Sequence, residues 1–167
     1  LTIEDTRLPK TYSNEKTTAL LSLEEGVGKM KAALEGRSDN SLIITARTSA
    51  FSVTNDEDAL VRAKAYEAAG VDALFFAGIS TRAQIEQLNA SISIPIFIAP
   101  KGNEVMDLTY LADKGVKICL QSHQPFSASV QAIYTTLKAL REGTTPSNIK
   151  SIASNELMKE VTRSEEY

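Results

Sequence analysis

Charged and polar residues follow the short apolar runs of this chain. Glu4 and Asp5 come directly after the first run, and Arg47 comes shortly after the second, at residues 42–44. A guanidinium at a strand end can bind a carboxylate through two parallel hydrogen bonds, which a lysine cannot copy. Two structural readings stay open: Glu4 as a surface carboxylate that ends a strand, and Arg47 as the partner of an acid such as Asp56.

The last apolar run, at residues 118–120, is followed by the only histidine of the chain, His123. Gln121 and Ser122 add polar groups beside it. An imidazole at a strand end can contact a substrate or move a proton, because its charge changes near neutral pH. A lone histidine with a purely structural role is the alternative.

Five apolar runs with helical patterns between them define the elements that must position these groups. In a parallel α/β fold all strand C-termini point the same way, and active sites are built at that edge. The pattern therefore predicts an enzyme. The runs are residues 1–3, 42–44, 73–76, 95–98 and 118–120.

The helices are marked by capping signals. Ser22 with Glu25, and Thr54 with Glu57, match the capping box that begins a helix. Another helix is expected to start near Pro125, which suits a first turn.

Residues 69–73 and 114–118 repeat one pattern: a helix end, a left-handed glycine turn and a buried strand. Repeated βα units of this kind fit two folds. One is a complete five-stranded doubly wound sandwich, and the other is the last five-eighths of a (β/α)8 barrel. The absence of a glycine-rich phosphate loop after the first strand weakens the sandwich.

Composition narrows the class of protein. The 167 residues are 43% hydrophobic and 23% charged, with a formal net charge of −3. A single domain of this size can bury a core, while the interspersed charges predict no nucleic-acid partner and the short apolar runs no membrane segment. Cys119 is the only cysteine, which suits a reducing compartment, and we expect a cytoplasmic location.

Several segments together resemble the isocitrate lyase/phosphoenolpyruvate mutase superfamily, and most closely its oxaloacetate decarboxylase branch. The superfamily motifs are Ile-Glu-Asp at 3–5, Pro-Lys at 9–10, Ile-Thr-Ala-Arg-Thr at 44–48 and the helix-to-strand turn at 65–73. The branch features are residues 1–6, residues 25–29, Gly102-Asn103 after the seventh barrel strand and His123 after the eighth.

The resemblance implies a (β/α)8 TIM barrel, of which residues 1–142 form the last five βα units and residues 143–167 a helical tail. Leu1 then begins the fourth strand. The first three units, with an aspartate pair that holds Mg²⁺, are expected in an N-terminal segment that completes the barrel. It also implies a homo-oligomer in which the segment after Pro125 is exchanged between subunits.

For the site, the resemblance implies Mg²⁺, with Mn²⁺ as an alternative, bound by Glu4 through water. Asp5 then orients its neighbours by hydrogen bonds. Arg47 binds a substrate carboxylate, and His123 faces the departing carboxylate or helps to reprotonate the product enolate.

Three further residues follow from the resemblance. Lys10, in a segment that matches a mobile lid, balances substrate charge, unless it is a solvated loop lysine. Tyr12 and Asn103 contact the substrate. Tyr12 replaces the catalytic Cys of the lyase branch and the Asn of the mutase branch, and Ala77 replaces the Glu of the citrate-type lyases.

The expected function is a Mg²⁺-dependent carbon–carbon lyase acting on a small 2-oxo dicarboxylic acid, with oxaloacetate decarboxylation as the leading reaction. A 2-methylisocitrate lyase-like or phosphoenolpyruvate phosphonomutase-like enzyme is the alternative. A catalytically inactive remnant, serving as a binding or assembly subunit, is the hypothesis from another class.

Overall fold

The computed structural model describes residues 1–9, 18–121, 123–164 and 166. The chain forms two compact units, Leu1–Ser122 and His123–Tyr167. The sequence prediction divided the chain at residue 142 instead, with the helix after Pro125 counted as part of the barrel. That division stays a prediction about the complete fold.

A parallel sheet forms the centre of the first unit. Its strands lie in the order β1-β2-β3-β4-β5, so each strand pairs with the next one along the chain. A doubly wound sandwich reverses direction within the sheet, and this one does not. The order is that of consecutive barrel strands. The strands are β1 (Thr2–Glu4), β2 (Thr45–Thr48), β3 (Ala73–Ala77), β4 (Ile96–Ala99) and β5 (Val116–Cys119).

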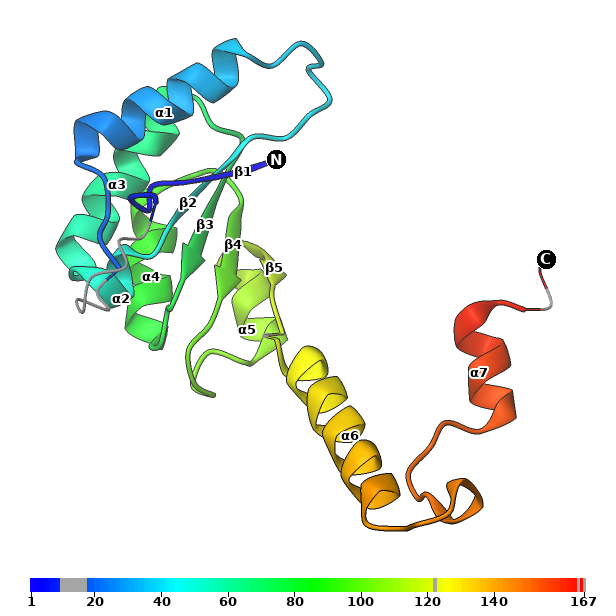
Figure 1. The fold of residues 1–167 in the computed structure, drawn as a ribbon. Coiled ribbons are helices and arrows are strands. Elements are labelled where there is room, and N and C mark those ends of the chain that lie inside the picture. The colour runs from blue at the N-terminus through cyan, green and yellow to red at the C-terminus, as the bar shows by residue number, and fades with distance from the viewer. Residues whose placement is uncertain (10–17, 122, 165, 167) are drawn as a thin grey trace. The chain divides into compact units, whose positions relative to one another are not determined.

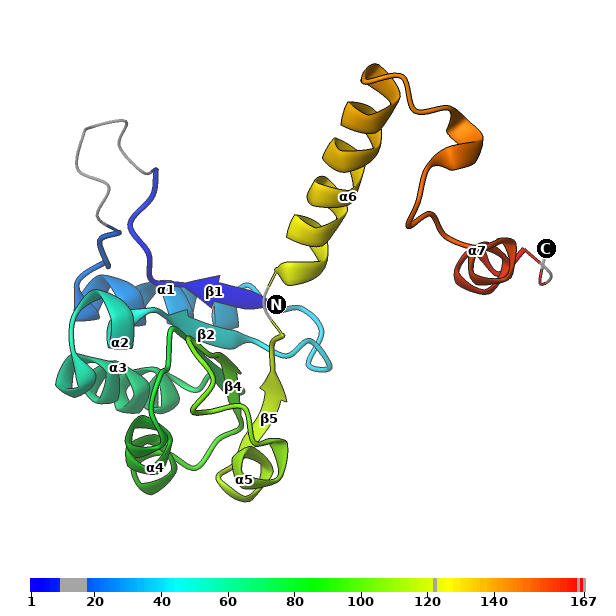
Figure 2. The same cartoon turned by 90° about the horizontal axis from the view of Figure 1, so that it is seen from below.

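The helices of the first unit lie along one side of this sheet (Figures 1 and 2). Two-sided coverage, which a doubly wound sandwich requires, is therefore missing from the described part of this unit. The helices are α1 (Leu23–Glu35), α2 (Ala50–Val53), α3 (Asp56–Ala69), α4 (Arg82–Ser91) and α5 (Leu108–Asp113).

Local signals explain where the helices begin and end. The capping box of Ser22 and Glu25 is confirmed at the start of α1. The capping box of Thr54 and Glu57 is wrong, because Asn55 caps α3 by accepting a hydrogen bond from the backbone of Asp58. Both glycine turns are confirmed. Gly70 has φ +97° and Gly115 has φ +79°, a left-handed conformation that favours glycine.

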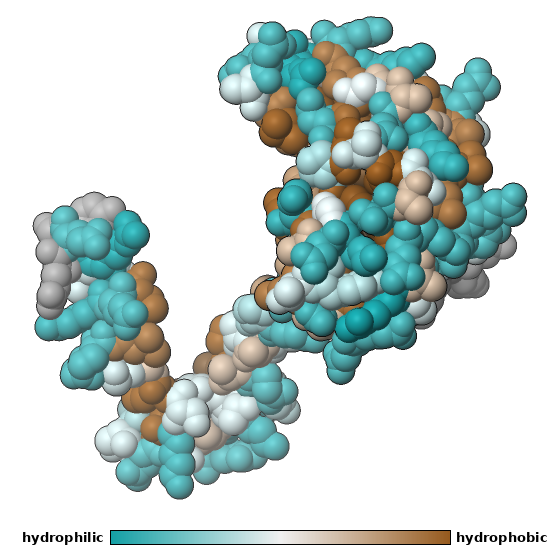
Figure 3. Space-filling view, turned by 180° about the vertical axis from the view of Figure 1, so that it is seen from behind, coloured by the Kyte–Doolittle hydropathy of each residue, from teal (hydrophilic) through white to brown (hydrophobic). Residues whose placement is uncertain are grey.

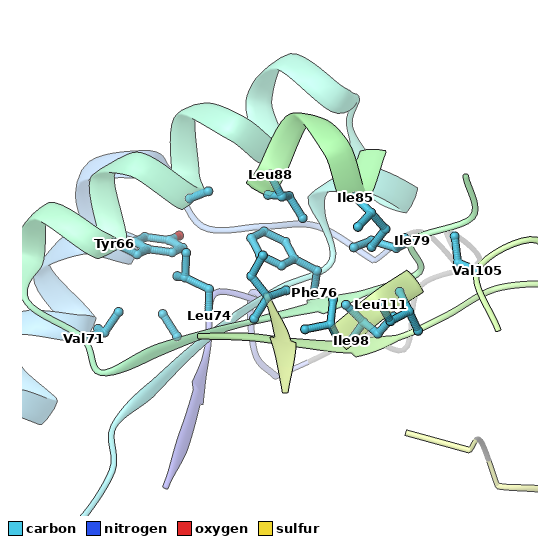
Figure 4. Packing of buried hydrophobic residues seen from close by; sticks show 14 of the residues in the cluster. Tyr66, Val71, Leu74, Phe76, Ile79, Ile85, Leu88, Ile98, Val105 and Leu111 are labelled. Carbon is cyan, nitrogen blue, oxygen red and sulfur yellow. The ribbon is translucent and has the colours of Figure 1, made fainter. Parts of the chain in front are cut away.

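The core lies between the helices and one face of the sheet. Figure 4 shows Tyr66, Ile85 and Leu88 on the helix side and Leu74 and Phe76 on the sheet. All five side chains are at most 1% exposed. Burying a side chain of this size stabilises the fold by roughly 1.5–3 kcal/mol, so this core holds the strands in place.

The opposite face of the sheet carries a set of side chains that we call the cross-sheet row. Ala46, Leu74 and Ile96 are in register with one another and belong to the core. Since successive side chains on a strand point to opposite faces, the residues that follow them point away from the core. The cross-sheet row consists of Glu4, Arg47, Phe75, Phe97 and Ile118, which pair across the five strands. The pairing of Phe97 with Ile118 follows a register shift between β4 and β5.

The second unit consists of α6 (Gln124–Arg141), a 3₁₀ turn (Pro146–Asn148) and α7 (Asn155–Thr162). Pro125 lies in the first turn of α6, as the sequence predicts. None of the residues described in this unit is buried. Figure 3 shows hydrophobic side chains, in brown, at its surface. On α6 they are Phe126, Val130, Ile133, Tyr134, Leu137 and Leu140, and on α7 Leu157, Met158 and Val161.

Within the described ranges of the chain, the helices lack the combined length and apolar character that a membrane crossing requires.

Candidate functional site

Glu4 and Arg47, the two strongest site residues from the sequence, lie side by side at the C-terminal ends of β1 and β2. They are in register on neighbouring parallel strands. Nη1 of Arg47 is 3.1 Å from Oε2 of Glu4, and both side chains are about one-third exposed. Arg47 therefore pairs with an acid, as the structural alternative for this residue predicted. The acid is Glu4, whereas Asp56 accepts a hydrogen bond from Gln84.

Phe75 supports the guanidinium of Arg47. The centre of that guanidinium lies 5.2 Å from the centroid of the Phe75 ring, within the range of a cation–π interaction. Phe75 is not among the site residues predicted from the sequence. The sequence could have indicated it, because successive side chains on a strand point to opposite faces of the sheet. Phe75 therefore points to the other face from its buried neighbours Leu74 and Phe76.

The Nε atom of Arg47 is buried and has no hydrogen-bond partner among the described residues. A buried donor without a partner costs free energy, which an incoming acceptor recovers. Glu4 occupies only the Nη1 side of the guanidinium. The exposed part of the guanidinium is suited to a carboxylate oxygen of a ligand.

Asp5 points to the helix side of the sheet and is fully buried. Its Oδ2 atom accepts hydrogen bonds from the Tyr66 hydroxyl at 2.7 Å and from Nη1 of Arg62 at 3.1 Å. The backbone N–H of Asp5 donates to the carbonyl of Arg47, and its own carbonyl accepts from Leu21. Asp5 therefore joins β1 to three other parts of the unit.

Burial and charge shift the ionisation of the residues around Asp5. Burial raises the pKa of the Tyr66 phenol, and its hydrogen bond to the carboxylate of Asp5 raises it further. Burial alone lowers the pKa of Arg62, but hydrogen bonds to Asp58 and Tyr66 and the charge of Asp5 raise it above its ordinary value. Tyr66 is therefore a neutral donor and Arg62 a fixed cation.

Lys29 on α1 contacts the backbone of Glu4 in the candidate site. Its Nζ donates a hydrogen bond of 2.9 Å to the carbonyl oxygen of Glu4. This carbonyl lies on the side of β1 that does not pair with β2. Lysines are common along unpaired strand edges because they oppose pairing with another chain. Sequence reasoning did not single out Lys29.

Strands β3 and β4 both end in a small residue. Ala77 and Ala99, the last residues of β3 and β4, are in register. Asn103 follows in the loop after β4 and is exposed. The backbone N–H of Lys101, in the same loop, donates to the carbonyl of Ile79. The loops after β3 and β4 are thus joined at the edge that carries Glu4 and Arg47.

The positions of three predicted site residues relative to this pair are not part of the described structure. Lys10 and Tyr12 lie outside the described residues. His123 precedes α6 and belongs to the second unit. Their roles stay predictions.

The described residues supply few of the oxygen ligands that Mg²⁺ requires. Among the described residues, no group of three or more His, Cys, Asp and Glu side chains could hold a metal ion. Glu4 supplies one carboxylate with hard oxygen atoms, about one-third exposed and on the face of the sheet away from the helices. It is suited to contacting a metal through water, with the direct ligands coming from elsewhere.

The chain matches known proteins along nearly its whole length. A family model described as phosphoenolpyruvate phosphomutase covers residues 1–141. An oxaloacetate decarboxylase of Bradyrhizobium sp. (strain ORS 278) is 51% identical over 163 residues, which is 98% of this chain and 56% of the relative. The chain therefore spans little more than half the length of this relative.

Solved structures show the same fold. A phosphoenolpyruvate phosphomutase from Streptomyces platensis subsp. rosaceus superposes with a TM-score of 0.80 at 26% identity, over 99% of this chain and 60% of that one. A phosphonopyruvate hydrolase in complex with oxalate and Mg²⁺ gives a TM-score of 0.76 at 24% identity, over 99% and 59%.

Proposed function

Because the chain belongs to the phosphoenolpyruvate phosphomutase family, we propose that the protein containing it decarboxylates oxaloacetate with the help of Mg²⁺. The observation that carries this proposal is the Glu4–Arg47 pair, set on the open face of the sheet with a free guanidinium donor. The half-identical Bradyrhizobium relative supports the choice of substrate.

Arg47 binds a carboxylate of the substrate in this proposal. Its planar guanidinium rests on Phe75, and its Nε atom has no partner among the described residues. Charge-assisted hydrogen bonds of this kind are among the stronger ones in proteins, and the planar group also fixes the orientation of the acid. Asn103 and Tyr12 are proposed to make further contacts with the substrate.

Glu4 contacts Mg²⁺ through water, while the aspartates that hold the ion directly come from a segment outside residues 1–167. Mg²⁺, or Mn²⁺ in its place, would supply Lewis-acid stabilisation of the negative charge that develops on the 2-oxo acid during decarboxylation. The phosphonopyruvate hydrolase neighbour was solved with Mg²⁺, which supports a divalent cation for this fold.

Lys10 and His123 complete the proposed roles. Lys10 balances substrate charge, and His123 faces the departing carboxylate or returns a proton to the enolate. The reaction then converts oxaloacetate and one proton into pyruvate and CO₂. A cytoplasmic location is part of the same proposal.

Two enzyme alternatives are weaker. Tyr12 stands where the lyase branch has its Cys and the mutase branch its Asn, and Ala77 stands where citrate-type lyases have Glu. These departures disfavour cleavage of 2-methylisocitrate and formation of phosphonopyruvate. An inactive binding or assembly subunit is the remaining candidate.

The second unit supports a homo-oligomer. Residues spaced along α6, such as Ile133 and Leu137, expose about 60% of their apolar side chains. Exposed apolar surface of this extent is typical of an interaction site. We propose that another subunit covers it by helix exchange.

The proposed reaction is tested with the complete protein in the presence of Mg²⁺. We expect pyruvate to be released from oxaloacetate much faster than from 2-methylisocitrate. Rapid succinate release from 2-methylisocitrate would instead identify the lyase alternative. Failure to bind Mg²⁺ together with any 2-oxo acid would leave the inactive subunit as the function.

A further inference from the structure

One face of α3 carries a chain of polar groups that ends at Asp5. Asp58, Arg62 and Tyr66 lie four residues apart and therefore share this face. Oδ2 of Asp58 accepts from Nε of Arg62 at 2.9 Å and from the Thr54 hydroxyl at 2.7 Å. Arg62 and Tyr66 then both donate to the same oxygen of Asp5.

We propose that Arg62 and Tyr66 are positioning residues that act through Asp5 on the Glu4–Arg47 pair. The proposal rests on the function proposed above, because it assigns them to that site. Neither residue touches the open face of the sheet. Their effect is on the orientation of the two groups that do.

The backbone shows how the effect is transmitted. Glu4 and Asp5 are consecutive, so their side chains point to opposite faces of the sheet. Fixing the side chain of Asp5 on the helix side therefore fixes the direction of the Glu4 side chain. The N–H of Asp5 also donates to the carbonyl of Arg47 at 3.1 Å. One anchored carboxylate therefore sets the ends of both strands that carry the pair.

The energetics of the buried network favour positioning over stability. Arg62 is 6% exposed and Asp5 fully buried, so both charges have lost most of their water. Desolvation of a buried ion pair often cancels its attraction, and well-packed apolar residues are frequently at least as stable. Oδ1 of Asp5 moreover has no partner among the described residues. A geometric requirement at the strand ends explains a network that adds little stability.

Gly26 on α1 leaves the space in which the Tyr66 hydroxyl reaches Asp5. A Cβ atom at position 26 would overlap that hydroxyl oxygen, while it would lie 3.2 Å from Cζ and 3.3 Å from Cε1 of the same ring. The severe overlap is therefore with the hydroxyl alone. Gly26→Ala should push the hydroxyl off Asp5, and Tyr66→Phe should make room for the extra methyl group.

The test uses the complete protein and the binding of oxalate with Mg²⁺, a ligand that is bound without turnover. We expect Tyr66→Phe and Gly26→Ala each to weaken oxalate binding about ten-fold or more. The double variant should bind as well as Tyr66→Phe alone, because the overlap is gone. The control is Leu88→Val, a buried change on α4, which should lower the melting temperature with unchanged oxalate affinity.

A second measurement needs no ligand. The NMR signal of the Arg47 Nε–H group should move in Tyr66→Phe and in Gly26→Ala, but not in Leu88→Val. Equal oxalate affinity and an unmoved Arg47 signal in the first two variants would overturn the positioning role. An active-site signal that responds in a protein unable to decarboxylate oxaloacetate would support the positioning role while rejecting the proposed reaction.

Discussion

The two units of this chain differ in where they place their apolar side chains. The first unit buries them between its helices and its sheet, with Phe76 and Ile85 fully inaccessible. In the second unit, no described residue is buried, although Ile133 and Leu137 repeat along α6 at helical spacing. A helix with an apolar face is stabilised mainly by packing. The first unit therefore has a core of its own, whereas the apolar face of α6 is left uncovered by the residues described in the second unit.

The sheet of the first unit also has an uncovered surface, of a different kind. Its core covers one face of the sheet, while the cross-sheet row occupies the other. The outer strands β1 and β5 each have one neighbour in the described part of the chain. A closed barrel removes such edges. In the function proposed above, further barrel strands complete the first unit and another subunit covers the second.

The largest expected effect comes from supplying the first of these partners. Residues 1–167 expressed alone should be insoluble, or soluble only as an oligomer, and inactive toward oxaloacetate, because unpaired edges and apolar surface favour association. A separate chain with the first three βα units should restore solubility and activity, measured by size-exclusion chromatography and pyruvate release. A cooperatively melting monomer of 1–167 would contradict the requirement for further strands.

Truncation of one apolar side chain in each unit should separate internal from intermolecular packing. Phe76→Ala should lower the free energy of unfolding by about 3–5 kcal/mol at every protein concentration, since it opens a cavity in the core. Ile133→Ala, at a residue that is 60% exposed in the chain, should act on oligomer dissociation instead. Denaturant titrations over a range of protein concentrations measure both. A concentration-independent loss of equal size in Ile133→Ala would erase the difference between the units.

Arg47→Lys should affect chemistry more than folding. We expect kcat/KM to fall roughly ten- to a hundred-fold with a nearly unchanged melting temperature, because a charge-assisted hydrogen bond contributes about 1.5–3 kcal/mol. Arg82→Lys is a matched control. Arg82 also stacks on an aromatic ring, Tyr110, and pairs with an acid, Asp107, but lies on the helix side. A large drop in melting temperature with normal kinetics would make Arg47 a structural residue.

The smallest effect concerns alkaline pH. Burial and the carboxylate of Asp5 raise the pKa of Tyr66, so its contribution to stability is complete below the unfolded value of about 10 and is lost as the pH rises beyond it. The difference in free energy of unfolding between the wild type and Tyr66→Phe should therefore shrink above about pH 10. A difference that stays constant across this range would mean that the phenol is not held in its protonated form.

Much of the fold could be predicted because its signals are local. The glycine turns at Gly70 and Gly115 and the capping box at Ser22 each depend on a few neighbouring residues. Parallel strands then bring their ends to one edge, which is why Glu4 and Arg47 could be expected together. The start of α3 was predicted wrongly at Thr54, because Thr54 and Asn55 are both good caps and sequence alone does not rank them.

The rest of the site depends on contacts between distant residues. Asp5 meets Arg62 and Tyr66 across 57 and 61 positions of sequence, and no periodicity within one element predicts such a contact. Phe75 could have been assigned to the open face from strand alternation. Its position beneath Arg47 further requires the register between β2 and β3, which the sequence does not specify.

The cross-sheet row places its side chains at regular intervals across the sheet. Neighbouring strands lie about 4.8 Å apart, so each position in the row presents its side chain at a fixed interval from the next. Exchanging a residue that does not contact Glu4 or Arg47 changes the chemistry at its own position and leaves that pair in place. A protein engineer could therefore vary position 97 while Glu4, Arg47 and the supporting ring of Phe75 keep their arrangement. Constant and variable positions within one row suit a fold whose solved examples include both a phosphomutase and a hydrolase.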